Sequence, residues 1–229
     1  MPQKVILDVD TGDDDAVSIM LACLHPAIDV LGVCSVNGHI MVHEATENTL
    51  KVLHHIGADD VPVYEGMGEP FVRPDFPDPE RRPSRRIGDR MPLAEPTAQK
   101  QAKHAVDFYV DALMASNGDV KIAMSGTHSN LAMAIRMEPR IVERIGEIVA
   151  MGGGYEWANV TPAAENNIWS DPEGARVVLA CGAPVRLITL DQTIKLVLSP
   201  EKIRALEALG TPAASLTAEL INKMIRKYG

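Results

Sequence analysis

The chain has 229 residues, a formal net charge of −9 at pH 7 and 46% apolar residues. This length fits one domain that buries most of its chain, so folding requires neither a disulfide framework nor structural zinc. The acidic balance argues against nucleic acid as a partner, because phosphate backbones bind clustered Lys and Arg. The three cysteines, Cys23, Cys34 and Cys181, are too scattered for a disulfide scaffold and indicate buried thiols in a reducing compartment.

The N-terminus and the apolar runs predict a cytoplasmic protein with no membrane partner. Met1 to Lys4 lead directly into a strand-like segment and do not have the form of a signal peptide. The longest apolar run, over residues 16–24, is too short to span a bilayer.

Strand-like and helix-like segments alternate along the chain. Pro26 and Gly57 follow helical runs, and the pairs at 171–172 and 199–200 combine an N-cap residue with proline at the first helical position. This alternation predicts an α/β fold with a mostly parallel open sheet and helices on both faces. The expected order is strand 5–10, helix 16–25, strand 28–36, helix 43–56, strand 61–64, helix 100–116, strand 120–124, a helical stretch, strand 147–151, helix 171–181, strand 184–190, and helices from 199 and after 212.

Ligand sites in open parallel sheets lie beyond the carboxyl ends of the strands. The segments that follow the predicted strands are 8–15, 36–39, 125–130, 151–167 and 191–192. Candidate functional residues are therefore expected in these segments.

Residues 66–96 depart from the strand and helix pattern, because they hold seven of the sixteen prolines and show no strong periodicity. Loops of this length inside a compact domain are typical of lids or disordered segments. A solvated face or an oligomer contact explains the basic residues of this loop better than a phosphate site does. They are Arg73, Arg81, Arg82, Arg85, Arg86 and Arg90.

Five carboxylates lie within eight residues after the first predicted strand. Helix capping accounts for one or two of them, because acids are favoured at a helix N-terminus. Five like charges this close raise one another's pKa and oppose folding, and a bound cation would resolve that conflict. The segment offers oxygen ligands without His or Cys, which favours Ca²⁺ or Mg²⁺ over zinc. The five are Asp8, Asp10, Asp13, Asp14 and Asp15.

A metal-dependent phosphatase is a weaker alternative for this segment. Haloacid-dehalogenase-type phosphatases also begin with a strand that ends in Asp-x-Asp. They place a small hydroxyl residue two positions after the second Asp, where this chain has Gly12. Asp14 and Asp15 are not part of that pattern, and no anion-binding loop of glycines and lysine is present.

Four motifs in chain order resemble those of one enzyme family. Residues 8–16, Asp-Val-Asp-Thr-Gly-Asp-Asp-Asp-Ala, closely resemble the signature Asp-x-Asp-x-Gly-x-Asp-Asp-Ala of the inosine-uridine-preferring nucleoside hydrolases. Residues 125–132 are similar to the family's hydroxyl-Gly-x-x-Thr-Asn turn, 151–154 match its glycine run, and 165–173 match its Glu-x-Asn and Asp-Pro-Glu segment. The resemblance implies a Rossmann-like nucleoside hydrolase fold in a single domain over residues 1–229.

The resemblance also implies a reaction and a metal. The family cleaves the N-glycosidic bond of ribonucleosides and binds one Ca²⁺. Carried over, Asp10 and Asp15 would ligate calcium by side chain and Ser125 by its backbone carbonyl. Asp10 would also accept the proton of a calcium-bound water that attacks an oxocarbenium-like sugar.

Carboxylate and amide side chains would then hold the ribose. Asp14, Asn159, Glu165 and Asn167 match the family's sugar-binding positions, and Met151 matches a residue packed beside the ribose. Without the family pattern, turn formation would explain the polar residues of this loop and core packing would explain Met151. Asp8 fits a structural partner better than a metal ligand.

The chain departs from the family in three places. At His39 the family usually has an Asn that contacts the sugar; His39 retains a hydrogen-bond donor, and Asn37 offers an amide nearby. Residues 86–89 keep a glycine of the family's His-Gly-x-x-Gly-like segment but no histidine. The family's C-terminal His-Asp pair has no counterpart, since the last His is His128 and the last Asp is Asp191.

Two hypotheses follow from the motifs and the departures. The first is a calcium-dependent nucleoside hydrolase, which by resemblance would be a homodimer or homotetramer. The second is a catalytically impaired, hydrolase-like binding or scaffold protein that lacks the family's C-terminal segment. Release of ribose from nucleosides distinguishes the two.

Overall fold

The computed structural model describes residues 1–72 and 90–228. Within these residues, six parallel strands form one sheet in the order β3-β2-β1-β4-β5-β6. This order confirms the predicted parallel α/β sheet. The strands are β1 (Gln3–Val9), β2 (Ile28–Ser35), β3 (Val63–Glu65), β4 (Val120–Met124), β5 (Ile145–Met151) and β6 (Val185–Ile188).

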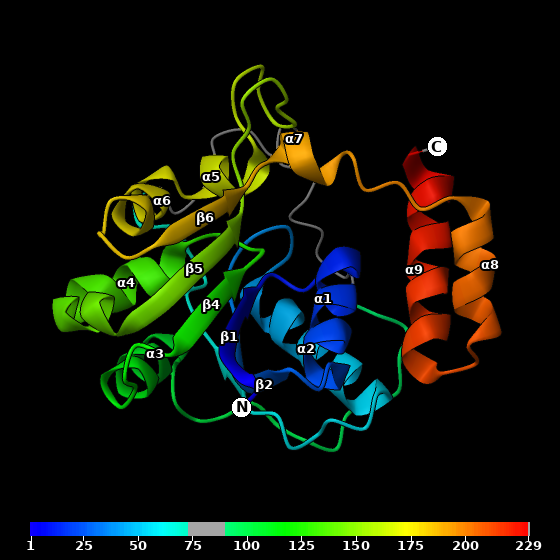
Figure 1. The fold of residues 1–229 in the computed structure, drawn as a ribbon, viewed down its shortest axis with the longest axis horizontal. Helices are drawn as coiled ribbons and strands as arrows, with labels where there is room; N and C mark the ends of the chain where they lie inside the picture. Colours follow the sequence, from blue (N-terminus) through cyan, green and yellow to red (C-terminus); the bar gives the residue numbers. More distant parts are fainter. Residues whose placement is uncertain (73–89, 229) are drawn as a thin grey trace.

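Helices cover both faces of the sheet, with α1 and α2 on one side and α3, α4 and α6 on the other (Figure 1). The α8–α9 hairpin packs against α1 on the outside of the first layer. The bounds are α1 (Asp13–Leu24), α2 (Val42–His55), α3 (Ala105–Met114), α4 (Ser129–Met137), the 3₁₀ helix η1 (Pro139–Arg144), α5 (Asn166–Ser170), α6 (Pro172–Leu179), α7 (Leu190–Thr193), α8 (Pro200–Ala208) and α9 (Pro212–Tyr228).

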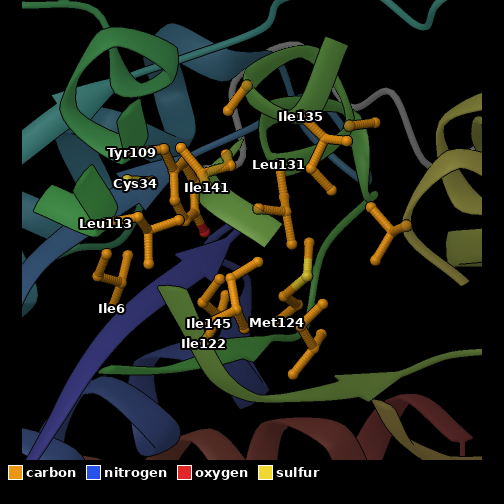
Figure 2. Close-up of a cluster of buried hydrophobic side chains, with 14 of the residues drawn as sticks. Ile6, Cys34, Tyr109, Leu113, Ile122, Met124, Leu131, Ile135, Ile141 and Ile145 are labelled. Atoms are coloured by element: carbon orange, nitrogen blue, oxygen red, sulfur yellow. The ribbon is translucent and has the colours of Figure 1, made fainter. Parts of the chain in front are cut away.

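Alternation along β1 divides the core into two clusters. Val5, Leu7 and Val9 pack with α1 and α2, whereas Ile6 points to the opposite face. Figure 2 shows Ile6 in that second cluster, with Tyr109 of α3 and Leu131 of α4. Asp8 shares the face of Ile6, so its carboxylate is carried into the layer of α3 and α4.

The predicted helix caps at 171 and 199 are confirmed. The Asp171 side chain accepts the backbone N–H of Gly174 at 2.9 Å, and the Ser199 hydroxyl accepts that of Lys202 at 3.3 Å. Acids also occupy the first turn of α1, as expected.

Several predicted boundaries are wrong. Helix 100–116 is shorter, because His104 caps α3 by accepting the N–H of Val106 at 3.2 Å. Strand β6 ends at Ile188, because α7 begins two residues later. The polar segment 165–170 contains the unpredicted helix α5, which begins after the Glu165 cap. Strands β3 and β5 each differ from the predicted limits by one or two residues.

The thiols are free but unequal in burial. Cys34 is fully buried, as predicted, whereas Cys23 and Cys181 are only half-buried. None of the described helices is long and apolar enough to cross a membrane.

Only the ends of the proline-rich loop are described. Arg90 pairs with Glu47 at 3.1 Å, which places this arginine on a solvated face. The other five arginines and the segment 86–89 lie outside the described residues.

His128 is a buried base at the start of α4. Its side chain is 0% exposed, and within residues 1–72 and 90–228 neither ring nitrogen has a hydrogen-bond partner. Burial lowers the pKa of His128 from 6.5 to about 4. Between pH 6.5 and pH 4 the unfolded chain therefore binds up to one more proton than the folded chain. The unfolding free energy that the neutral His128 preserves above pH 6.5 is lost as the pH falls toward 4.

We expect His128→Leu to remove this acid sensitivity. The loss of unfolding free energy between pH 7 and pH 4 should shrink by roughly 3 kcal/mol, since one pKa unit corresponds to about 1.4 kcal/mol. Urea unfolding at both pH values measures the difference. The exposed His43 provides the control: His43→Leu should leave the pH dependence of the wild-type protein in place.

Candidate active site

The predicted functional segments meet where the strand order reverses. β1 lies between β2 and β4. The helices that follow β1 and β2 lie on one face of the sheet, and the helix that follows β4 lies on the other. In open α/β sheets the ligand crevice lies at such a switch point, outside the carboxyl ends of the strands, so it is expected here beyond β1 and β4. Asp10 follows β1 and Ser125 follows β4, so both lie at this edge of the sheet.

Asp10 is enclosed by the turns after β2 and β4. Its side chain is 2% exposed, and its Oδ2 atom accepts the backbone N–H of His39 at 2.6 Å. A Cβ atom at Gly38 would lie 2.0 Å from that oxygen, and one at Gly126 would lie 3.2 Å from Oδ1. Glycine at both positions therefore lets the backbone approach the carboxylate.

Asp15 lies beside Asp10 at the N-terminus of α1. Its side chain is 4% exposed, and Oδ2 accepts the backbone N–H of Gly12 at 3.0 Å. The other oxygen, Oδ1, accepts a hydrogen bond from the Ser125 hydroxyl. The end of β4 and the start of α1 are thereby joined around one carboxylate.

Burial and like charge disfavour ionisation of this pair. The pKa of Asp10 is raised to about 7, mainly by burial and also by the charge of Asp14, although the hydrogen bond from the His39 N–H acts in the opposite direction. The pKa of Asp15 is raised well above its ordinary value, first by burial and then by the charges of Asp10 and Asp14. A cation would relieve both effects.

The donor set fits a hard cation only with help from the backbone. In the described part of the chain, no three His, Cys, Asp or Glu side chains gather as a metal cluster. Asp10 and Asp15 supply two carboxylates, and carbonyl or water oxygens would have to complete the shell. The Ser125 carbonyl is directed toward the neighbouring α5, where it accepts the Nδ2 hydrogen of Asn167 at 2.7 Å.

Helix α5 brings predicted sugar-binding residues to the same edge. Asn167 also donates to the Met151 carbonyl at 3.2 Å and lies 3.4 Å from the Met151 sulfur, so it joins the ends of β4 and β5. Glu165 caps α5 and accepts the N–H of Gly153 at 2.9 Å. These contacts hold the start of α5 against the glycine run after β5.

Asn166, which the sequence motif left unspecified, links the turn after β2 to the loop before α5. Its Nδ2 atom lies 3.2 Å from Nε2 of His39, and its backbone N–H donates to Oδ1 of Asn159 at 2.9 Å. A neutral His39 with its proton on Nδ1 accepts this bond. The sequence could have indicated Asn166 only through its position between two motif residues, Glu165 and Asn167.

The remaining predicted residues occupy different settings. Asp14 is exposed in the first turn of α1, and Asn159 is exposed in the loop before α5. Asn37 is buried, and its amide donates to the Met67 carbonyl at 3.2 Å and to the Ser129 hydroxyl at 3.3 Å. Asn37 therefore ties the end of β2 to α4 and to the segment after β3.

Asp8 has the structural setting expected of it. It is fully buried and accepts the Tyr109 hydroxyl at 2.8 Å and the Asn130 amide at 3.2 Å. Burial raises the pKa of Asp8 to about 7, although both hydrogen bonds act in the opposite direction. The carboxylate is thus bonded to α3 and α4 rather than to Asp15.

The close approach at Gly38 gives a test of this packing. We expect Gly38→Ala to lower the unfolding free energy by about 1–3 kcal/mol, because its methyl group would overlap the Asp10 carboxylate. Chemical denaturation measures the loss. At Gly68 a methyl group meets only Val42, at 3.4 Å, so Gly68→Ala should have a much smaller effect. Equal losses for the two variants would contradict the described packing around Asp10.

Comparison with known proteins agrees with the motifs and the fold. The family model for inosine-uridine preferring nucleoside hydrolases matches residues 5–229. The pyrimidine-specific ribonucleoside hydrolase RihB of Escherichia coli (strain K12) is 42% identical, over 96% of this chain and 70% of RihB.

Solved structures agree as well. A purine-preferring ribonucleoside hydrolase from Gardnerella vaginalis superposes with a TM-score of 0.87 at 30% identity, over 98% of this chain and 72% of that structure. The plant nucleoside hydrolase PpNRh1 gives a TM-score of 0.85 at 27% identity, over 96% and 70%. The chain therefore belongs to the inosine-uridine preferring nucleoside hydrolase family of enzymes.

Proposed function

We propose that the protein hydrolyses the N-glycosidic bond of ribonucleosides and releases the free base and ribose. The pair of buried carboxylates, Asp10 and Asp15, at the switch point of the sheet carries this proposal. Family membership supports the reaction class. The names of two relatives differ in base, one pyrimidine-specific and one purine-preferring, so the proposal does not extend to base preference.

Asp10, Asp15 and the Ser125 carbonyl would hold a Ca²⁺ ion in this proposal. The all-oxygen donor set and the unfavourable burial of two like charges support it. Bound calcium would lower the pKa of the attacking water and balance the negative charge of the site.

Asp10 would act as the general base. The water oxygen bonds to the anomeric carbon while Asp10 takes the water proton, and the C–N bond breaks with its electron pair leaving on the nucleobase. The nucleobase takes up a proton from solvent, and Asp10 afterwards releases its proton to solvent. The 2.6 Å hydrogen bond from His39 holds one Asp10 oxygen in place, so the carboxylate enters the reaction already oriented. Burial excludes bulk water from this oxygen.

Polar groups from both sides of the crevice would hold the ribose hydroxyls. Asp14 and His39 come from the β1 and β2 side, and Asn159, Glu165 and Asn167 come from the β5 side. Met151 would pack against the sugar, and Asn37 would support the turn that carries His39. The bonds that now join Asn159 to Asn166 and Asn167 to Ser125 hold these donors close to where the sugar would sit.

The cytoplasmic location and the homodimer or homotetramer stay predictions of the sequence. The absence of a nucleic-acid partner also rests on the acidic net charge alone.

We expect the purified protein with calcium to release ribose from nucleosides, measured as reducing sugar. Asp10→Asn should lower kcat by about 10²–10⁴-fold, because the amide cannot accept the water proton. The control is Asp29→Asn, an exposed acid on β2, which should retain wild-type turnover. A calcium-bound wild-type chain that cleaves no nucleoside in a broad panel would instead favour the binding-protein hypothesis.

Calcium should also stabilise the fold. At a free Ca²⁺ concentration of 100 times Kd, the unfolding free energy should rise by about 2.7 kcal/mol, as expected for one site in the native state. Asp15→Asn should abolish most of this gain, whereas Asp29→Asn should preserve it. Thermal unfolding with and without EDTA measures the effect, and an equal gain in the Asp15→Asn variant would place the ion elsewhere.

A further inference from the structure

The loop between β5 and α5, residues 152–165, carries Asn159 and Glu165 and lies next to α7 (Figure 1). Its C-terminal half is secured by the contacts of α5 described above. The N-terminal half, residues 153–157, has little apolar packing, since Tyr155 and Trp157 are 93% and 56% exposed. Hydrogen bonds must therefore determine its conformation.

Asp191, in the first turn of α7, supplies those hydrogen bonds. Its Oδ2 atom accepts the backbone N–H of Tyr155 at 2.8 Å, and its Oδ1 atom accepts that of Glu156 at 2.8 Å. The neighbouring Leu190 donates its N–H to the Gly153 carbonyl at 2.9 Å. Two consecutive residues after β6 thus hold three residues of the loop.

The turn itself is built to meet this carboxylate. A Cβ atom at Gly154 would lie 1.9 Å from the Trp157 carbonyl oxygen and 3.5 Å from Oδ2 of Asp191. Residues 154–157 therefore close tightly, and only glycine fits at their start. The two backbone N–H groups lower the pKa of Asp191 to about 2, so the acceptor stays charged at neutral pH.

We propose that Asp191 is a positioning residue that anchors the loop 152–165 and so places Asn159 and Glu165 for binding of the ribose. This inference rests on the proposed function, because it concerns how the sugar is held. Asp191 acts through the backbone of Tyr155 and Glu156 and contacts no substrate itself. An asparagine at this position could accept only one of the two N–H groups, since its Nδ2 atom is a donor.

The test compares Asp191→Asn with Asp119→Asn. Asp119 is a matched control because it also accepts a backbone N–H from a turn, that of Asn117 at 3.3 Å, but it precedes β4 at the opposite end of the sheet. Asp191→Asn should raise KM about tenfold, with kcat changed less than about threefold. The control should keep wild-type values of both.

Two further measurements separate positioning from a general loss of structure. The amides of Tyr155 and Glu156 should exchange their hydrogens at least about tenfold faster in Asp191→Asn, with an unchanged melting temperature. The rise in KM should be the same for two nucleosides that share ribose and differ in base. A rise confined to one base would overturn a role in holding the sugar.

The remaining outcomes are equally decisive. If Asp191→Asn does not fold, Asp191→Glu replaces it, because the extra methylene group displaces both acceptor oxygens from the positions at which they meet the two N–H groups. Faster amide exchange with a wild-type KM in either variant overturns the proposal. An inactive wild-type protein would contradict the proposed function instead, and active wild-type protein with an unaffected Asp191→Asn variant would contradict this inference alone.

Discussion

Two carboxylates buried side by side are the constraint around which this protein is built. Asp10 and Asp15 are almost inaccessible, and burial opposes their ionisation. Backbone N–H groups from His39 and Gly12 partly offset that cost. The His39 N–H can reach Asp10 because the preceding Gly38 has no side chain where the backbone comes closest to the carboxylate. The tight turns after β2 and β4 are thus packed directly against the Asp10 carboxylate.

Two acids at the end of β1, one within the strand and one just beyond it, have different roles. Asp8 points into the layer of α3 and α4, where Tyr109 and Asn130 satisfy it. Asp10 lies beyond the strand end, where the chain leaves the sheet and turns toward α1. The same local sequence therefore supplies one carboxylate that ties the helical layer to the sheet and one that lies at the switch point of the sheet. A change at Asp8 would act on the layer behind the site.

The sequence predicted the features that depend on near neighbours. Strand alternation, proline-containing helix starts and the acidic first turn of α1 are local patterns, and motif order placed Asp10, Asp15 and Ser125 together. The contact between His39 and Asn166 joins residues that are 127 positions apart in the chain. The bonds from the loop before α5 to Asp191 join residues that are 35 or 36 positions apart. No local periodicity encodes such pairs. Helix α5 was missed because its cap is a glutamate within a run of turn-forming residues.

The central place of β1 also affects how the molecule assembles. β1 is the first strand in the chain, yet one of its two partners is β4, with Lys4 opposite Val120. Bringing such distant segments together costs conformational entropy before the pairing contributes stability, and contacts between distant residues are associated with slow folding. The hydrogen bond between Asp15 and Ser125 spans 110 residues and forms only across this junction. The contact between Asp15 and Ser125 therefore depends on the pairing of β1 with β4, so slowing that pairing would delay formation of the site even when β1, α1 and β2 have already formed.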